Sequence, residues 1–460
     1  MKLEEVHSVY FLGIGGIGMS AIARWFHANG YFVSGYDKTS TVLTKQLETE
    51  GIVIHYTDDV SLISDKIKSD KVGSLIIFTP AVPKDLKELA YFRAEGFEVF
   101  KRSQVLGMLT QSKFTIAVAG THGKTTTSSM VAHLLKSIGV DCSAFIGGIM
   151  TNYNSNLLIG TNDEVMVVEA DEFDRSFLTL HPDIAIITAT DADHLDIYGD
   201  RNALKDSFKD FIKNIKANGT LFLEEKVAKD LDIHSLENVS VVTYGLKEGQ
   251  IKSTNLTIDN GDFYFDWVSA NREIKNLKLA MPGFHNVSNA LAALSAVSGF
   301  EDSDEKIKAG LASYKGVKRR FEYIIKSADC VFIDDYAHHP EEIRALLESV
   351  RAIYPDREIT VVFQPHLFSR TRDFMDGFAE SLSLADHVVL LDIYPARELP
   401  IEGITSDVIK EKINTKSVHS YVKDDVLDYF EAHQPDLVLT VGAGDIDTLV
   451  LPIKQKLEKK

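Results

Sequence analysis

The chain has 460 residues, and at about 150 residues per domain this length predicts roughly three domains. Hydrophobic residues make up 45% and charged residues 25%, which excludes collagen-like, mucin-like and wholly disordered chains. Lys and Arg number 49 against 67 Asp and Glu, and the formal net charge of −18 argues against a nucleic-acid binder. An anionic small substrate would need local devices, such as glycine-rich loops, helix N-termini, a few placed cations or a metal ion.

The sequence carries no sign of export or of a membrane. Cys142 and Cys330 both lie in apolar strings and predict buried thiols rather than a disulfide. Glu4 and Glu5 precede a short apolar run, unlike a secretory signal peptide. No apolar run approaches the roughly 18 residues that a membrane helix needs. We therefore expect a cytoplasmic protein without membrane insertion, either a monomer or a homodimer.

The first part of the chain alternates apolar strands with a helix, which is typical of a parallel α/β sheet. Strands are predicted over residues 8–12, 32–36 and 75–78, and a helix over 19–29. A Rossmann-like domain is therefore predicted for residues 1–107.

The middle part, residues 108–315, continues the α/β pattern, and its later residues no longer alternate strands with helices. Short β segments and turns between residues 251 and 281 predict an antiparallel insertion. We predict a central domain of the P-loop ATPase type. Its expected strands are 115–119, 165–169 and 184–187, and its expected helices are 124–138, 286–297 and 303–313.

The last part, residues 316–460, alternates strands and helices again and predicts a second Rossmann-like domain. Its expected strands are 331–334, 359–363, 387–391 and 437–441, and its expected helices are 340–354, 370–382 and 445–459.

A glycine-rich loop joins the first predicted strand to the first helix. Its sequence, Gly13-Ile14-Gly15-Gly16-Ile17-Gly18, fits the pattern G-x-G-x-x-G, and Asp37 ends the second strand. Such glycines let the backbone reach a pyrophosphate at a helix N-terminus, and the acid can hold a ribose hydroxyl. The pattern leaves open NAD, a nucleotide sugar, or a tight turn without a ligand.

A second glycine loop joins strand 115–119 to a helix, with the sequence Gly120-Thr121-His122-Gly123-Lys124-Thr125-Thr126. It is shorter than the usual eight-residue phosphate loop, because Val118 stands where that pattern has glycine. Its N–H groups can cradle phosphates, while Lys124 can reach the β- and γ-oxygens and Thr125 can bind Mg²⁺.

Acidic residues follow two predicted strands of the middle part. The carboxyl ends of parallel strands face the ligand crevice of an open sheet, so a Mg²⁺ site is predicted there, with a solvated acidic loop as the alternative. The residues are Glu169, Asp171 and Glu172 after one strand, and Asp191, Asp193, His194 and Asp196 after the next.

Three later polar clusters could also bind ligands. Amides can bind a purine edge, a basic cluster can bind phosphate, and arginine binds carboxylates bidentately. Each residue alone could instead be a helix cap or part of a surface ion pair. The clusters are His285, Asn286 and Asn289; Lys318, Arg319 and Arg320; and residues 334–340 with Gln364, His366, Arg370 and Arg372.

Taken in order, these motifs resemble the Mur ligases, ATP-dependent amide-forming ligases of peptidoglycan synthesis, along essentially the whole chain. The resemblance implies a UDP-substrate domain (1–107), a central ATP-binding domain (108–315) and a C-terminal domain (316–460) that closes over ATP and receives the amino acid. It implies ATP and Mg²⁺ as cofactors, with Mn²⁺ as a substitute, and a UDP-sugar rather than NAD at the first loop. The motifs are residues 13–18, 120–126, 169–172, 193–196, 285–289, 319–321, 335–340, 364–372 and 442–444.

The resemblance also assigns roles to residues by position. The implied catalytic residues are Lys124, His194, His338, His366 and Arg370. ATP is implied at Gly120, Thr121, His122, Gly123, Lys124, Thr125, Thr126, His285, Asn286, Asn289, Arg320 and Asp335. The UDP-sugar and amino acid are implied at Gly13, Gly15, Gly16, Ile17, Gly18, Asp37, Thr79, Tyr336, His366 and Arg370. The implied metal ligands are Thr125, Glu169 and His194.

Within the family, the motifs are most similar to the branch that attaches the first amino acid, L-alanine, to UDP-N-acetylmuramate. Several siblings have a carbamylated, metal-supporting lysine where this chain has Phe208, and the alanine-adding branch is similar in lacking it. Position 367 is Leu where many alanine-adding members have Arg. The resemblance therefore implies that Arg370 makes more of the contact with the substrate carboxylate in this chain.

The implied reaction begins with attack of the lactyl carboxylate on the ATP γ-phosphate, and the amine of L-alanine then attacks the acyl phosphate. Either His338 or His366 could take the ammonium proton. Three alternatives remain: a ligase that attaches a ready-made tripeptide to the same UDP-sugar, a nicotinamide oxidoreductase, and a catalytically silent nucleotide-switched binding module.

Overall fold

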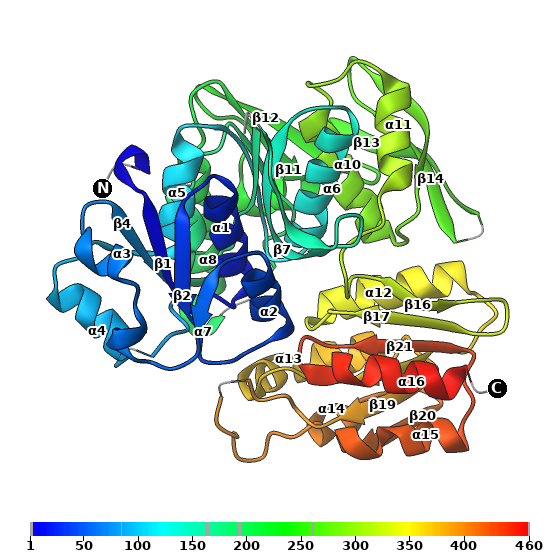
Figure 1. Ribbon diagram of the computed structural model, residues 1–460. Helices are drawn as coiled ribbons and strands as arrows, with labels where there is room; N and C mark the ends of the chain where they lie inside the picture. Colours follow the sequence, from blue (N-terminus) through cyan, green and yellow to red (C-terminus); the bar gives the residue numbers. More distant parts are fainter. Residues whose placement is uncertain are drawn as a thin grey trace. The chain divides into compact units, whose positions relative to one another are not determined.

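The computed structural model describes residues 3–83, 85–161, 165–191, 195–259, 261–396 and 398–458. The chain is a three-domain α/β protein built on three β-sheets, which confirms the predicted fold class (Figure 1). Its residues gather in two compact units. The first unit contains Met1–Thr254, Trp267–Lys275 and Ser288–Ser313, and the second contains Asn255–Asp266, Asn276–Val287 and Tyr314–Lys460.

The first sheet contains β1 (Ser8–Leu12), β2 (Phe32–Tyr36), β3 (Val53–His55), β4 (Ser74–Phe78) and β5 (Val99–Lys101). The strands are parallel, in the order β3-β2-β1-β4-β5. Its helices are α1 (Ile17–Ala28), α2 (Val42–Thr49), α3 (Asp65–Ser69), α4 (Lys87–Ala94) and α5 (Arg102–Gln111), with short 3₁₀ helices η1 (Leu3–Glu5) and η2 (Val60–Leu62).

Strand β1 is buried along its whole length because it has an apolar layer on each face. Val9 and Phe11 share one buried cluster with residues of α1 and α5. Tyr10 and Leu12 share another cluster with residues of α3 and α4. A parallel strand covered by helices on both sides reads as a continuous apolar run, which is why the sequence predicted it correctly.

The second sheet has ten strands in the order β15-β14-β13-β12-β11-β10-β6-β9-β7-β8. They are β6 (Phe114–Ala119), β7 (Cys142–Met150), β8 (Ser155–Leu158), β9 (Val165–Glu169), β10 (Ile184–Ile187), β11 (Gly219–Glu224), β12 (Val239–Gly245), β13 (Ile251–Asp259), β14 (Asp262–Val268) and β15 (Glu273–Leu279). The helices are α6 (Lys124–Ser137), α7 (Leu195–Tyr198), α8 (Arg201–Lys213), α9 (Glu225–Leu231), α10 (Phe284–Val297), α11 (Asp304–Ser313) and η3 (Phe173–Thr179).

Strand β6 lies between β9 and β10 and is parallel to both. The segments that follow these three strands therefore leave the sheet at the same edge, which is where ligands bind in open α/β sheets. These segments are residues 120–126, which we call the phosphate loop after their predicted role, the acidic residues after β9 and the start of the segment after β10.

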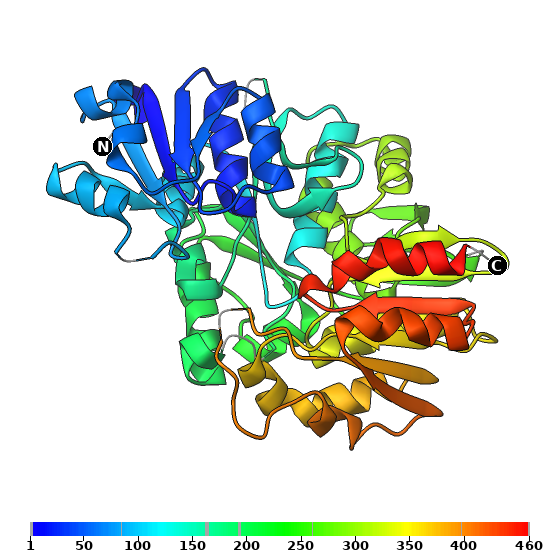
Figure 2. The same ribbon diagram turned by 60° about the horizontal axis from the view of Figure 1, so that its bottom comes forward.

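The third sheet contains β16 (Glu322–Lys326), β17 (Val331–Asp335), β18 (Thr360–Phe363), β19 (His387–Leu391), β20 (Ser417–Tyr421) and β21 (Leu437–Val441). Their order is β16-β17-β21-β18-β19-β20, and only β16 pairs antiparallel among the described strands of this sheet. The helices are α12 (Pro340–Ile353), α13 (Phe368–Leu382), α14 (Asp407–Lys410), α15 (Val426–Ala432) and α16 (Val450–Leu457), with η4 (Lys423–Asp425) and η5 (Asp445–Leu449). Helix α16 packs beside α15 and against β16 (Figure 2).

The prediction of one helix over residues 445–459 is wrong. The segment forms η5 and then α16, which begins at Val450. Pro452 explains the break, because proline has no N–H and is tolerated only in the first turn of a helix. A helix that ran through from Asp445 would place Pro452 in its interior.

Two smaller expectations can also be compared with the structure. Cys142 and Cys330 are both free and buried, as predicted. Within the described ranges, no helix is long and apolar enough to cross a membrane.

A buried amide joins helix α1 of the first domain to the second sheet. Asn156 of β8 is fully buried, and its Nδ2 donates to Ile17 O in the first turn of α1 at 2.6 Å. Arg24 of α1 donates from Nη1 to Asn156 Oδ1 at 2.9 Å. The helix that follows the first glycine loop is thus hydrogen-bonded to the central sheet.

Candidate active site

Two glycines with positive φ shape the loop between β6 and α6. Gly120 has φ +130°, and a Cβ there would lie 2.2 Å from Thr188 Oγ1. Gly123 has φ +79°, and a Cβ there would lie 2.7 Å from Asn289 Oδ1. Gly123 also precedes α6 without a side-chain cap, so the helix presents its first N–H groups to an anion.

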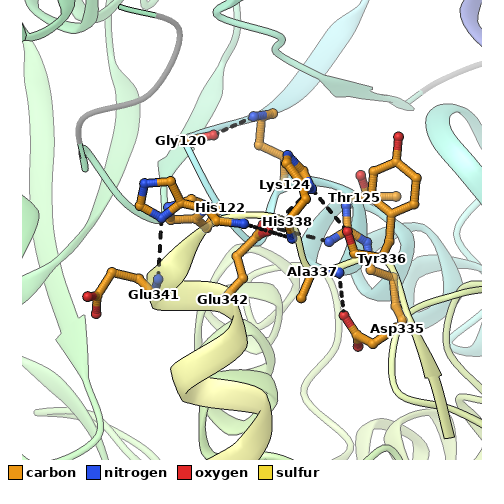
Figure 3. Close-up of polar contacts among 12 residues, drawn as sticks. Gly120, His122, Lys124, Thr125, Asp335, Tyr336, Ala337, His338, Glu341 and Glu342 are labelled. Atoms are coloured by element: carbon orange, nitrogen blue, oxygen red, sulfur yellow. Dashed lines mark hydrogen bonds and ion pairs between the residues drawn. The ribbon is translucent and has the colours of Figure 1, made fainter. Parts of the chain in front are cut away.

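Lys124 opens α6, and its ammonium group is held at the loop. Its Nζ donates to Gly120 O at 2.7 Å (Figure 3) and to Glu172 Oε1 at 2.9 Å. Burial opposes the charge of Lys124, but the carboxylates of Glu172, Asp171 and Glu169 outweigh it and raise the pKa. The side chain therefore stays charged beside the phosphate loop.

Thr125 and Glu169 bring two candidate oxygen ligands together. Thr125 Oγ1 donates to Glu169 Oε1 at 2.9 Å, and Gly147 N donates to Glu169 Oε2 at 2.7 Å. A Cβ on Gly147 would lie 2.6 Å from that same oxygen, so only glycine allows this approach. A hydroxyl and one carboxylate fit Mg²⁺, which takes few protein ligands and completes its shell with phosphate oxygens and water.

No group of three His, Cys, Asp or Glu within the described ranges could hold a metal ion by itself. Two predicted members of the acidic cluster after β10, Asp193 and His194, lie outside the described residues. The predicted metal and catalytic roles of His194 therefore stay predictions.

The phosphate loop is hydrogen-bonded to the segment after β10. Thr121 N donates to Ala189 O at 3.0 Å, and Asp191 N donates to Thr121 Oγ1 at 3.1 Å. His122 Nε2 lies 3.7 Å from Asp191 Oδ2, while its carbonyl accepts from the Thr188 hydroxyl. Thr126, the last residue of the motif, is buried in the first turn of α6.

The predicted purine-binding residues are divided between the two units. Asn289 belongs to the first unit and contributes the amide oxygen beside Gly123. His285 and Asn286 belong to the second unit, where Asn286 Nδ2 donates to Pro282 O at 2.6 Å. Burial lowers the pKa of His285 to about 4, so its imidazole is neutral near pH 7.

In the second unit, Asp335 fixes the segment that carries Arg320. Asp335 Oδ2 accepts from Phe321 N at 2.6 Å and Oδ1 accepts from Ala337 N at 2.8 Å (Figure 3). Burial raises the pKa of Asp335 to about 6, although Arg320 and the two N–H groups act in the opposite direction. The Arg320 guanidinium lies 5.1 Å from the ring centroid of Tyr336.

The predicted histidines of the second unit lie close together. The ring centroids of His338 and His366 are 6.2 Å apart, and Tyr336 lies 5.4 Å from His338. His338 Nδ1 is 3.0 Å from Tyr336 O. His366 stacks on Tyr394 at 5.7 Å with an interplanar angle of 17°. The sequence pattern thus found both histidines but missed Tyr394.

The start of α13 carries Arg370, which is buried. Leu367 precedes the helix with φ 71°, and Glu398 accepts hydrogen bonds from Ser369 N at 3.0 Å and Ser369 Oγ at 2.5 Å. Burial opposes the charge of Glu398, but the Ser369 hydrogen bonds outweigh it and lower the pKa.

The first glycine loop is in contact with the two residues predicted to line it. A Cβ on Gly13 would lie 2.7 Å from Thr79 Cγ2. Asp37 Oδ2 accepts from Gly15 N at 2.7 Å and Oδ1 accepts from Thr39 N at 3.0 Å. The carboxylate therefore shapes the loop itself, a role that the motif did not suggest.

Sequence reasoning missed Gly147, Asn156 and Tyr394. None of them belongs to a motif, and each reaches its place only because the fold brings distant segments together. A glycine pair in an otherwise apolar strand, Gly147-Gly148, was the one available signal, since glycine in a strand often marks a close approach.

Three family models match the chain in order along its length. They are the Mur ligase family catalytic domain over residues 8–114, the Mur ligase middle domain over 118–297 and the Mur ligase glutamate ligase domain over 319–444.

Individual relatives agree with these matches. UDP-N-acetylmuramate–L-alanine ligase of Cytophaga hutchinsonii is 50% identical, over 100% of this chain and 99% of its own. The enzyme of the same name from Flavobacterium psychrophilum is 48% identical over the full length of both chains. The crystal structure of UDP-N-acetylmuramate–alanine ligase from Thermotoga maritima has 30% identity and a TM-score of 0.80, covering 98% of this chain and 100% of that one. The chain belongs to the Mur ligase family of ATP-dependent ligases.

Proposed function

We propose that this chain joins the lactyl carboxylate of UDP-N-acetylmuramate to the amino group of L-alanine, with cleavage of ATP to ADP and phosphate. The observation that carries the proposal is the close identity, over the full length, to relatives named for this reaction. The phosphate loop supports it, because Lys124 and the Thr125–Glu169 pair are the groups that phosphoryl transfer requires.

The chemistry explains why ATP is needed. A carboxylate is a poor acylating agent because an oxide would have to leave. Attack of a lactyl carboxylate oxygen on the γ-phosphorus forms an acyl phosphate and breaks the bond to ADP. The amine of L-alanine then attacks the acyl carbon, the C–O bond to phosphate breaks, and the ammonium proton passes to a base.

The loop residues contribute positioning and charge to this sequence. Lys124 would neutralise the β- and γ-phosphates, and the N-terminus of α6 would hold their oxygens. Thr125 and Glu169 would hold Mg²⁺, which when bound neutralises charge on the transferring phosphoryl group. Asn289, whose amide oxygen lies beside Gly123, would contact the nucleotide.

The second unit offers the groups for the amino acid. Tyr336, His338, His366 and Arg370 are proposed to border L-alanine and the reacting carboxylate, and Asp335 and Arg320 to contact ATP. His338 and His366 are both candidates for the base, because their rings are neighbours and an imidazole titrates near neutral pH.

One assay tests the proposed activity and distinguishes it from similar ligase activities that use another amino acid or a tripeptide. ADP release is measured with UDP-N-acetylmuramate and, in turn, L-alanine, glycine, L-serine, D-glutamate and the L-Ala-γ-D-Glu-diaminopimelate tripeptide. We expect L-alanine to give the highest kcat/KM. Release of ADP with the tripeptide alone would show a recycling ligase, and no release with any of them would refute the proposed activity.

A further inference from the structure

Arg102 is a cation beside the first glycine loop that no sequence motif identified. It is the first residue of α5, and its guanidinium lies over the first turn of α1. A Cβ on Gly18 would lie 3.0 Å from Arg102 Nη1 and 3.2 Å from Arg102 Cζ. The third glycine of the G-x-G-x-x-G pattern therefore makes room for this side chain.

The surroundings of Arg102 contain positive charge without a matching anion. The side chain is half-buried, and the described part of the chain gives it no salt bridge or side-chain hydrogen bond. The first turn of α1 has no acidic residue, and its N-cap, Gly16, has no side-chain hydrogen bond. A cation at the positive end of a helix is unfavourable unless an anion lies between them.

The backbone around Arg102 is held in place on both sides. Thr179 of η3 donates from Oγ1 to Ser103 O at 2.8 Å. A Cβ on Gly107, in the same helix, would lie 2.5 Å from Thr179 O, so α5 packs closely on η3. A half-buried arginine on a fixed helix end is preorganised, since less side-chain entropy is lost when it binds.

We infer that Arg102 binds the diphosphate of the UDP-sugar, between its guanidinium and the N-terminus of α1. This inference rests on the proposed function, and it adds a residue to the substrate site rather than a new site. Arginine suits the task because its planar fork donates two parallel hydrogen bonds to phosphate oxygens. In a chain of net charge −18, this cation supplies local attraction for a dianionic group.

The test compares Arg102→Gln and Arg102→Lys with the exposed control Arg93→Gln, in α4 of the same domain. Dissociation constants are measured by calorimetry for UDP-N-acetylmuramate, UDP and uridine. We expect Arg102→Gln to weaken the binding of UDP-N-acetylmuramate and of UDP by about 10- to 100-fold, as for the loss of a charge-assisted hydrogen bond. The affinity for uridine, which has no phosphate, should not change. Arg102→Lys should recover part of the affinity, and the control should match wild type.

Gly18→Ala provides a second variant that should fold well, because alanine is the better helix former. The added methyl group would displace the Arg102 guanidinium. Gly18→Ala should therefore weaken UDP binding when it is the only substitution, and it should have no further effect when it is combined with Arg102→Gln. Additive losses in the double variant would show that Gly18 acts on the ligand directly and would overturn the coupling of Gly18 to Arg102.

Three outcomes would overturn the assignment of Arg102 to the diphosphate. They are unchanged UDP affinity in Arg102→Gln, an equal loss for uridine, and a loss for UDP-N-acetylmuramate alone, which would place Arg102 at the lactyl carboxylate. If wild type itself fails to bind UDP-N-acetylmuramate or to release ADP, the proposed function fails, which is distinct from a failure of this inference.

Discussion

At the scale of single residues, Lys124 is the proposed phosphate-binding cation, and its ammonium also neutralises the fully buried carboxylate of Glu172. Removing one partner of a buried ion pair costs about 3–5 kcal/mol. We expect Lys124→Ala to fold with a lower Tm and to lose ADP formation that depends on UDP-N-acetylmuramate. Thermal unfolding by circular dichroism and a coupled ADP assay check the two effects.

The double variant Lys124→Met with Glu172→Gln is the matched control. It leaves no buried charge unpaired, so Tm should recover towards wild type while ADP formation stays absent. Near-normal turnover in either variant would contradict the role of Lys124 in phosphate binding.

The hydrogen bonds of Glu169 with Thr125 and Gly147 allow its proposed metal-binding role to be separated from its structural role. Glu169→Gln keeps an oxygen that can accept from Gly147 N, but it removes the negative charge that a divalent cation needs. The free Mg²⁺ concentration that gives half-maximal activity should rise at least about tenfold, with little change in Tm. An unchanged Mg²⁺ titration would exclude Glu169 as a ligand.

At the scale of elements, one buried carboxyl group joins α4 to two strands. Tyr10 of β1 donates to Glu88 Oε2 at 2.6 Å, and its hydroxyl lies 2.7 Å from His55 Nε2 at the end of β3. Burial raises the pKa of Glu88 to about 7, although the hydrogen bonds from Tyr10 and Asp59 N oppose the shift. The folded state therefore favours the protonated form of Glu88.

This shift predicts how stability depends on pH. The pKa of Glu88 is about 7 in the folded state and 4.5 for a solvated glutamate side chain. The contribution of Glu88 to the free energy of unfolding is therefore fully present below pH 4.5 and is lost as pH rises towards 7. Glu88→Gln stays neutral throughout. We expect the stability of the variant relative to wild type to rise between pH 4.5 and 7 and then level off, measured by urea unfolding at each pH. A difference independent of pH would show that Glu88 titrates normally.

The start of α13 carries backbone strain that a matched pair of substitutions can measure. Leu367 has φ 71°, a region in which residues with a Cβ are disfavoured by about 1–2 kcal/mol. We expect Leu367→Gly to be more stable than Leu367→Ala by about 1 kcal/mol in urea unfolding, because glycine is free of that penalty. The reverse order, which is usual in helices, would argue against strain at this position.

The elements that the sequence predicted best are short buried strands. The predicted bounds of β1, β2, β9, β10 and β19 agree with the structure, because each strand is an apolar run bounded by turn residues. The half-exposed strands β3, β5 and β20 were missed, since their mixed residues carry no clear period. Helix α1 begins at Ile17, earlier than predicted, because glycines at a helix start read as loop.

At the scale of the whole molecule, the sequence identified candidate ligand-binding residues but did not predict the contacts that surround them. Motifs such as residues 120–126 are local, so their chemistry can be read from neighbouring residues. The contacts of Asn289 with Gly123, of Tyr394 with His366 and of Arg102 with Gly18 join distant segments. Such contacts follow from sheet order, which one sequence does not encode in any local pattern.

The net charge of −18 makes a prediction about the molecule as a whole. At long range this charge repels anionic substrates, whereas the proposed phosphate-binding cations Arg102 and Lys124 would attract them only at short range. Raising the ionic strength from 0.01 to 0.15 M shortens the screening length from about 30 to 8 Å and weakens the long-range repulsion. We therefore expect kcat/KM for UDP-N-acetylmuramate, at fixed free Mg²⁺ and saturating ATP, to rise by about twofold or more. In Arg102→Gln the rise should be steeper, because less local attraction is screened at the same time. A steady fall with salt in wild type would mean that the cations of the site, and not the net charge, govern the approach of the substrate.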